Sequence, residues 1–151
     1  MGIRFAALIA SLAVALTIAS PAGAGTGGRP LSTTLTGAEE FPGPGDSDAT
    51  GQASLKLNQG KERVCFDVSW TGIDGQVFAG HIHVGPPGVA GPIVVTLFSG
   101  SFTGTDAVSD CVTNVDRDLI KDIRQDPSGY YVNVHSMPNF PNGAVRGQLG
   151  D

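Results

Sequence analysis

The sequence predicts an all-β protein, a Greek-key sandwich or barrel of seven to eight short antiparallel strands with one short helix. Three observations carry this prediction. Short segments alternate apolar and polar residues, glycine- and proline-rich turns separate them, and a single segment has helical spacing. The chain has 151 residues, with 22 glycines and 10 prolines, which favours one domain and argues against an all-helical fold. Its hydrophobic fraction of 40% is too high for a disordered chain.

The first 24 residues have the layout of a secretory signal. Arg4 gives a positive start, an apolar run extends from Phe5 to Ile18, and Ala22-Gly23-Ala24 offers a small-residue cleavage site. A membrane anchor is the alternative reading, but the apolar run is short for a membrane span. We therefore expect a signal peptide at 1–24, a flexible lead-in at 25–30 and an exported domain at 31–151, secreted outside the cell or into the periplasm.

The strands of the first half follow from alternation. The clearest is Val64–Trp70, because Val64, Phe66, Val68 and Trp70 share one face, whereas Cys65, Asp67 and Ser69 share the other. Such a period of two is typical of a half-buried antiparallel strand. Two further strands precede it, at Leu31–Thr36 and Gln52–Leu57. A loop is expected at Phe41–Gly45 and a turn at Asn58–Gly60.

The second half continues the pattern with one exception. Ile82 and Val84 face one side of the strand Val77–Val84, and His81 and His83 face the other. A more buried strand follows at Pro92–Phe98. Ser99-Gly100 then marks a turn before a further short strand segment, Ser101–Thr105. The exception is Asp116–Arg124, where Asp116 can cap a helix and Leu119, Ile120 and Ile123 recur at helical spacing. The last expected strands are Tyr130–His135 and Ala144–Leu149.

The chain has two cysteines, Cys65 and Cys111. In an exported chain two cysteines most simply form one disulfide, which the chain-entropy model values at roughly 4 kcal/mol for a loop of this length. Two buried free thiols are the alternative.

All three histidines of the chain fall on expected strands. His81 and His83 are two residues apart and project from the same face, and His135 ends the strand Tyr130–His135. If these strands are neighbours, the three imidazoles converge on a site suited to copper or zinc, with a fourth position open. The alternative is a set of polar residues on a half-exposed face, hydrogen-bonded to the backbone.

Other candidates for chemistry are weaker. Glu39-Glu40 lies in a loop, where a pair of carboxylates can serve as general acid and base but is more often a solvated turn. We expect Trp70, Tyr130 and Tyr131 to be core or interface aromatics. The net charge of −5 argues against nucleic acid and anionic membrane as partners. No other long apolar run follows the signal, so we expect no membrane span after its cleavage.

Several motifs together resemble the CHRD domain, which is named for its repeats in the animal protein chordin and also occurs as single secreted bacterial copies. The motifs lie in the family's order over about residues 31–149, at Leu31–Glu40, Cys65–Val68, Ala79–Gly85, Gly88–Leu97, Gly129–His135 and Pro141–Leu149. The resemblance implies an immunoglobulin-like β sandwich or barrel. It implies little about activity, so we expect a binding or structural module and assign no catalytic residue. By analogy with chordin, its partner is expected to be a secreted or cell-surface protein. We also expect a monomer.

A fainter resemblance links the chain to copper/zinc superoxide dismutases. The similar features are the His81-x-His83 strand, the later His135, and Asn142-Gly-Ala-Val-Arg146 before the end of the chain. In that class the arginine steers an anionic substrate to copper, so a copper-dependent redox enzyme is the alternative function. The chain lacks the fourth copper histidine and the zinc-ligand cluster. Arg146 also has a structural reading, in which it bonds loop carbonyls or a carboxylate and fixes the chain end.

Overall fold

The computed structural model describes residues 1–2 and 30–150. The signal peptide and lead-in expected at 1–30 therefore lie, except for residues 1, 2 and 30, outside the described residues. Among the described residues no helix combines the length and apolarity that crossing a membrane requires.

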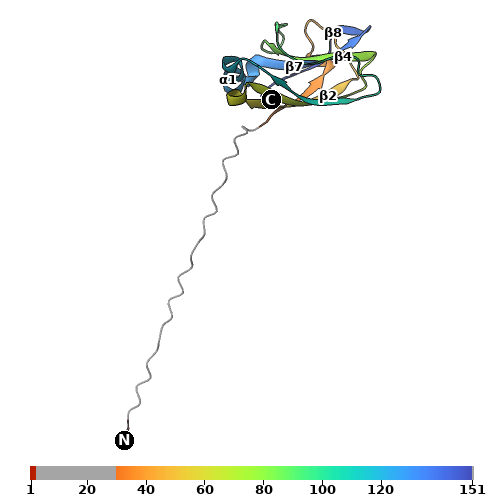
Figure 1. Cartoon of the computed structure of the whole chain (residues 1–151). Helices are drawn as coiled ribbons and strands as arrows, with labels where there is room; N and C mark the ends of the chain where they lie inside the picture. Colours follow the sequence, from red (N-terminus) through yellow and green to blue (C-terminus); the bar gives the residue numbers. More distant parts are fainter. Residues whose placement is uncertain (3–29, 151) are drawn as a thin grey trace.

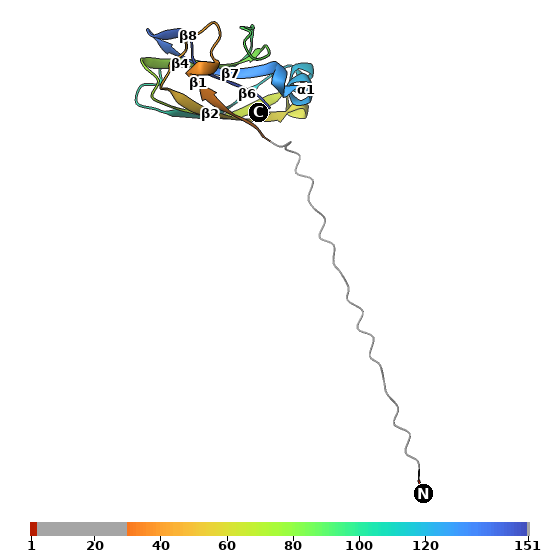
Figure 2. The same cartoon turned by 180° about the vertical axis from the view of Figure 1, so that it is seen from behind.

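Eight antiparallel strands form one sheet that curls into a nearly closed barrel (Figure 1). The order across the sheet is β5-β4-β7-β8-β1-β2-β3-β6, so β4 lies beside β7 and β3 beside β6 through long connections. Figure 2 shows the same barrel from behind. The strands are β1 (Leu31–Thr36), β2 (Thr50–Asn58), β3 (Arg63–Thr71), β4 (Gln76–Val84), β5 (Ile93–Ser99), β6 (Ala107–Thr113), β7 (Tyr130–Met137) and β8 (Phe140–Gln148). The all-β prediction is confirmed.

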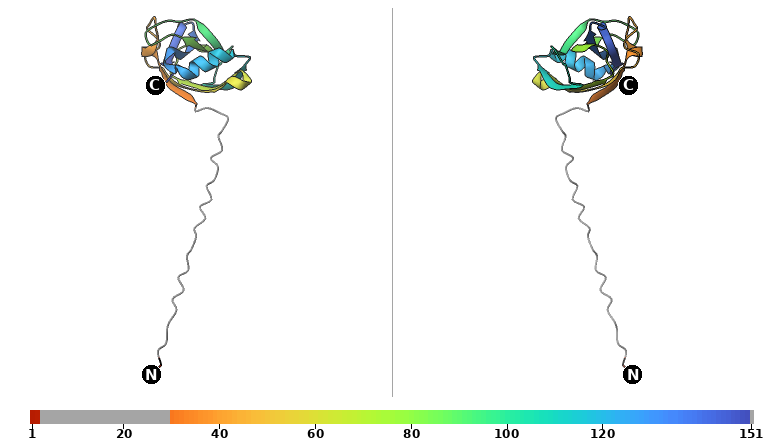
Figure 3. Two further views of the ribbon diagram at one scale, coloured as in Figure 1. Left: turned by 90° about the vertical axis from the view of Figure 1, so that its left-hand side faces the viewer. Right: turned by 90° about the vertical axis from the view of Figure 1, so that its right-hand side faces the viewer.

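The one α-helix in the described part of the chain, α1 (Arg117–Gln125), lies across one end of the barrel (Figure 3). Asp116 caps it as predicted, since its carboxylate accepts hydrogen bonds from the amides of Asp118 and Leu119. Ile120 and Ile123 are fully buried against the barrel core. Short 3₁₀ turns occur at Gly37–Glu39, Gln59–Lys61 and Pro127–Gly129.

The core fills the barrel with the apolar side chains that alternation assigned to the inner face. Val64, Phe66, Val68 and Trp70 of β3 are all buried there. The ring of Phe98 contacts those of Phe66 and Trp70, with centroids 6.0 and 5.8 Å apart. Gly80 faces Phe98 from β4, and a Cβ at this position would overlap the ring.

Two expectations about strands are wrong. Ser101–Thr105 contains no strand, and the strand that follows β5 is β6 (Ala107–Thr113), which the sequence analysis missed. β6 ends the sheet and has no fully buried residue, so it lacks the apolar repeat on which the prediction depended. Pro92–Phe98 is also less buried than expected, because Ile93 is half exposed.

The disulfide is confirmed. Cys65 of β3 and Cys111 of β6 lie directly opposite each other in the sheet and are joined by a disulfide bond. The alternative of two free thiols is therefore wrong. The bond fastens β6, which pairs with a strand on one side only, to its neighbour.

Candidate metal centre

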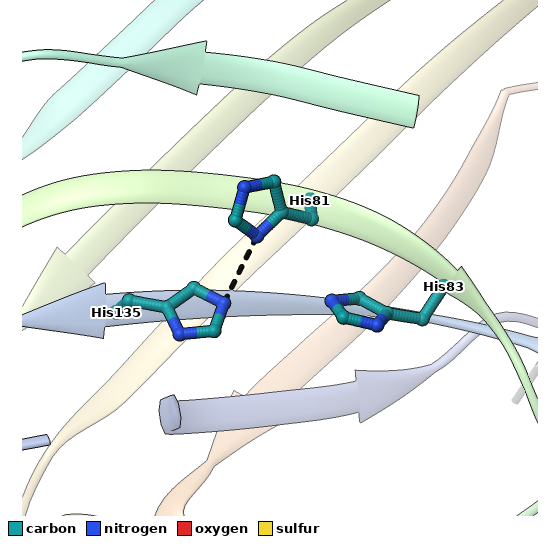
Figure 4. A group of neighbouring side chains, drawn as sticks. All are labelled: His81, His83 and His135. Atoms are coloured by element: carbon teal, nitrogen blue, oxygen red, sulfur yellow. Dashed lines mark hydrogen bonds between the residues drawn. The ribbon is translucent and has the colours of Figure 1, made fainter. Parts of the chain in front are cut away.

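Two adjacent strands bring the three histidines together on the outer face of the barrel. His81 and His83 lie on β4 and His135 lies on β7, and β4 pairs with β7 as the prediction required. The register places Ala79 opposite His135 and Asn133 opposite His81, so the imidazoles occupy neighbouring positions on one face. Figure 4 shows their rings pointing toward one another.

The imidazole nitrogens are close enough to surround one ion. Nδ1 of His81 lies 3.0 Å from Nε2 of His135, and one nitrogen from each ring lies within 4.8 Å of the others. Two nitrogens bound tetrahedrally to zinc are about 3.3 Å apart, and two bound to one ion cannot exceed about 4.2 Å. The widest separation must therefore shrink slightly on binding, and His81, the least buried of the three, is best placed to move.

Backbone carbonyls contact Nδ1 of two rings. Nδ1 of His83 lies 2.8 Å from the carbonyl oxygen of Gly91, and Nδ1 of His135 lies 3.1 Å from that of Pro141. A carbonyl can only accept, so in neutral His83 the proton is on Nδ1 and the lone pair on Nε2. This is the arrangement that carbonyls impose on metal-binding histidines. His135 has an acceptor oxygen at each ring nitrogen, because Oδ1 of Asn133 lies 3.0 Å from its Nε2.

His83 has a buried ring nitrogen that is available to a ligand. Its side chain is only 8% exposed, and its Nε2 is buried without a hydrogen-bond partner. A buried acceptor without a partner costs about 1–3 kcal/mol. An ion at the point where the three rings converge would satisfy this nitrogen.

The environment keeps the imidazoles neutral. Burial, together with the neighbouring His135 and His83, lowers the pKa of His81 to about 4. Burial also lowers the pKa of His83, opposed by the Gly91 carbonyl and the Asn133 side chain, and the pKa of His135, opposed by the Pro141 carbonyl. At neutral pH the rings therefore hold the free lone pairs that metal binding requires.

The face around the histidines is more buried than expected. The alternation of polar and apolar residues predicts a half-exposed polar face, but Asn133, Arg146 and Gln148 are at most 4% exposed. Loop 85–92 contributes carbonyls that bond Arg146 and Gln148, and loop 37–46 contacts β8 through the bond from the amide of Asp46 to the carbonyl of Ala144. The side-chain oxygen Oδ1 of Asn133 lies 3.0 Å from Nε2 of His135, next to the point where the three rings converge.

Arg146 forms hydrogen bonds with loop 85–92. Its guanidinium donates hydrogen bonds to the carbonyls of Val89 (2.9 Å) and Pro86 (3.0 Å) and to the side chain of Gln148 (3.1 Å). It also lies 3.4 Å above the ring of Tyr131. These contacts support the structural reading of Arg146, in which it bonds loop carbonyls.

Glu40 does not behave as a residue of a solvated turn. It is buried, its Oε1 has no partner, and burial raises its pKa to about 7 although Arg146 opposes this. Its neighbour Glu39 is exposed, as expected. Among the aromatics, Trp70 is in the core and Tyr131 is buried on the outer face.

Sequence reasoning missed the groups that orient the histidines. Gly91 and Pro141 act through their carbonyl oxygens, which leave no signal in a side-chain pattern. Gln148 donates to the carbonyls of Gly85, Ser128 and Tyr130. Its spacing of two from Arg146 was the available signal, since it places both on one face of β8.

Comparison with known proteins gives one assignment. No curated protein and no solved structure matches the chain significantly. A protein-family model, that of the CHRD domain, matches residues 31–149. CHRD domains are extracellular, and the Cys65–Cys111 disulfide fits such a location. The match covers the whole barrel and includes all three histidines, so the chain belongs to the CHRD-domain family.

Proposed function

We propose that this protein is an exported CHRD-domain binding module that holds a copper or zinc ion with His81, His83 and His135. The observation that carries the proposal is the convergence of three neutral imidazoles on one point, with Nε2 of His83 buried and unpartnered. Copper and zinc are the first-row ions that imidazole ligands suit best, and three histidines leave one coordination position open.

Each residue has a distinct part in this binding. Nε2 of His83 and Nε2 of His135 are held by carbonyl contacts on the opposite side of each ring, whereas His81 supplies Nδ1 and retains more freedom. A bound ion would supply Lewis acidity at the open position. The signal-like start of the chain and the disulfide both support export.

The copper redox enzyme gains no support from the geometry of Arg146. Tyr131 contacts both the guanidinium of Arg146 and the ring of His83, which stacks on it at 4.7 Å. Two groups at these distances cannot share one face of the ring, so Tyr131 separates the guanidinium from His83. Arg146 is thereby directed at loop carbonyls rather than at the histidines.

Calorimetric titration with Cu²⁺ and with Zn²⁺ tests the proposal. We expect one ion per chain, and a loss of at least tenfold in affinity in His83→Ala. Gln52→Ala, on an exposed position of β2, is the control and should bind as the wild type does. The absence of binding by the wild type, or equal binding by His83→Ala, would refute the site. Because the pKa values are lowered, affinity should persist below pH 6.5 and fall toward pH 4.

A further inference from the structure

Tyr131 and Arg146 surround His83 in a way that goes beyond packing. We propose that they are positioning residues, which hold Nε2 of His83 at the ion site by fixing the loop 85–92. The inference deepens the proposed function and rests on it for its effect on metal affinity. Its effect on the His83 ring is independent of any metal.

The first element is a stack of three side chains. The ring of Tyr131 lies nearly parallel to that of His83, with 9° between the planes and 4.7 Å between the centroids. The guanidinium of Arg146 lies over Tyr131 at 3.4 Å. Tyr131 is opposite His83 in the pairing of β7 with β4, so the sheet itself sets this contact. The stack restrains rotation of the His83 ring about its Cβ–Cγ bond.

The second element is the loop that orients the same ring. Arg146 binds the carbonyls of Pro86 and Val89, and the hydroxyl of Tyr131 lies 3.2 Å from the amide of Gly91, which donates to it. The carbonyl of Gly91 in turn accepts the Nδ1 proton of His83 at 2.8 Å. Every step from Arg146 to Nδ1 of His83 is therefore a direct contact.

Gly91 is required at this point by its close approach to β4. A Cβ there would overlap the carbonyl oxygen of Val84. The loop is also tied to β4 by the bond from the amide of Val84 to the carbonyl of Pro92 (3.2 Å). The position of the Gly91 carbonyl is thus determined by the loop, and the loop is held by Arg146 and Tyr131.

The consequence is a single tautomer and a single direction for the lone pair. With Nδ1 protonated and bound to Gly91, the lone pair of His83 is on Nε2, which faces His81 and His135 (Figure 4). Removal of such an outer contact typically lowers metal affinity 10- to 100-fold. Arg146 and Tyr131 therefore act on the ion only through His83.

Two measurements on four proteins test this inference. The proteins are the wild type, Tyr131→Phe, Tyr131→Leu and Arg146→Lys. The measurements are Zn²⁺ affinity by calorimetry and, in the metal-free protein, the NMR signal of the Nδ1 proton of His83. Tyr131→Phe keeps the stacked ring but removes the hydroxyl that accepts from the Gly91 amide, so its losses of affinity and signal should be smaller than those of Tyr131→Leu. Tyr131→Leu and Arg146→Lys should bind Zn²⁺ 10- to 100-fold more weakly, and the Nδ1 signal should shift or exchange away.

Thermal unfolding of each variant shows whether a loss of affinity comes from misfolding. Arg146→Lys keeps the positive charge at this position and removes the planar guanidinium. An unchanged Nδ1 signal in folded Tyr131→Leu would overturn the inference. If the wild type binds Zn²⁺, equally tight binding by Tyr131→Leu would also overturn it. If the wild type binds no Zn²⁺ but the Nδ1 signal still depends on Tyr131, the positioning role stands and the proposed metal function fails.

Discussion

The outer face of β4, β7 and β8 and the outer face of β2 and β3 arise from the same alternation of polar and apolar residues. On β2 and β3 the outward side chains Gln52, Asp67 and Ser69 are exposed, whereas Asn133 and Arg146 on β7 and β8 are at most 2% exposed. The difference lies in loops 37–46 and 85–92, which bond to the second face through Ala144 and Arg146. The alternation of polar and apolar residues thus decides to which side of the sheet a side chain points. Whether a loop covers that side decides whether the side chain is exposed to solvent.

The cover changes what polar groups must do. On the open face Asp67 accepts a bond from Ser109, and solvent can satisfy whatever remains. On the covered face, side chains and loop carbonyls must satisfy one another. Three buried side-chain atoms in the described part of the chain have no hydrogen-bond partner. Nε2 of His83 and Oε1 of Glu40 belong to the covered face and its loop, and Nε of Arg63 belongs to β3.

The largest expected effect belongs to the open face. Replacing both cysteines in Cys65→Ala/Cys111→Ala should lower the free energy of unfolding by about 4 kcal/mol, because the unfolded chain regains the entropy of an open loop. Urea denaturation measures this loss. Metal affinity should stay within twofold of wild type, since the disulfide lies on the other face. A parallel loss of metal affinity would show that the two faces are coupled.

The next effect belongs to Glu40, a buried residue of the covering loop 37–46. Its pKa in the folded protein, about 7, is above the ordinary 4.5, so the stability it contributes is present below pH 4.5 and is lost as the pH rises through 7. Glu40→Gln should therefore unfold with a free energy about 3 kcal/mol higher than wild type at pH 8, and with little difference at pH 4. Denaturation at the two pH values decides this, and a pH-independent difference would contradict it.

A matched pair of alanine substitutions compares the faces directly. Asn133→Ala removes a buried amide from the network and should cost about 2 kcal/mol, whereas Ser69→Ala on the open face should stay within about 0.5 kcal/mol. Thermal and urea unfolding of both variants provide the measurement. Equal effects would mean that burial of the polar face does not matter for stability.

The smallest expected effect concerns acid. The pKa of His81 in the folded protein is about 4, below the ordinary 6.5, so the unfolded chain binds more protons in this window and stability falls as the pH drops from 6.5 to 4. Since His81 is partly exposed, its share is about 1 kcal/mol. His81→Gln should flatten the curve of metal-free stability against pH by that amount, with Gln52→Ala as the unchanged control. An identical acid profile in His81→Gln would contradict the origin assigned to the loss.

The sequence predicted those parts of the molecule that depend on short-range patterns. The face of β3, the cap at Asp116 and the shared face of His81 and His83 all follow from spacings of two to four residues. It missed β6, whose polar residues give no period, and it underestimated the burial of Asn133 and Arg146. That burial depends on loops 37–46 and 85–92, which come from other parts of the chain. A local sequence pattern does not predict against which strands a loop packs.

The disulfide between β3 and β6 also links the fold to its surroundings. Before the bond forms, the terminal strand β6 is held to the sheet by non-covalent contacts with β3 alone among its sheet neighbours. A chain kept reduced inside the cell would lack the several kcal/mol that the bond contributes. The protein therefore reaches its full stability only in an oxidising compartment, so the redox state of its surroundings sets how firmly β6 is held to the barrel.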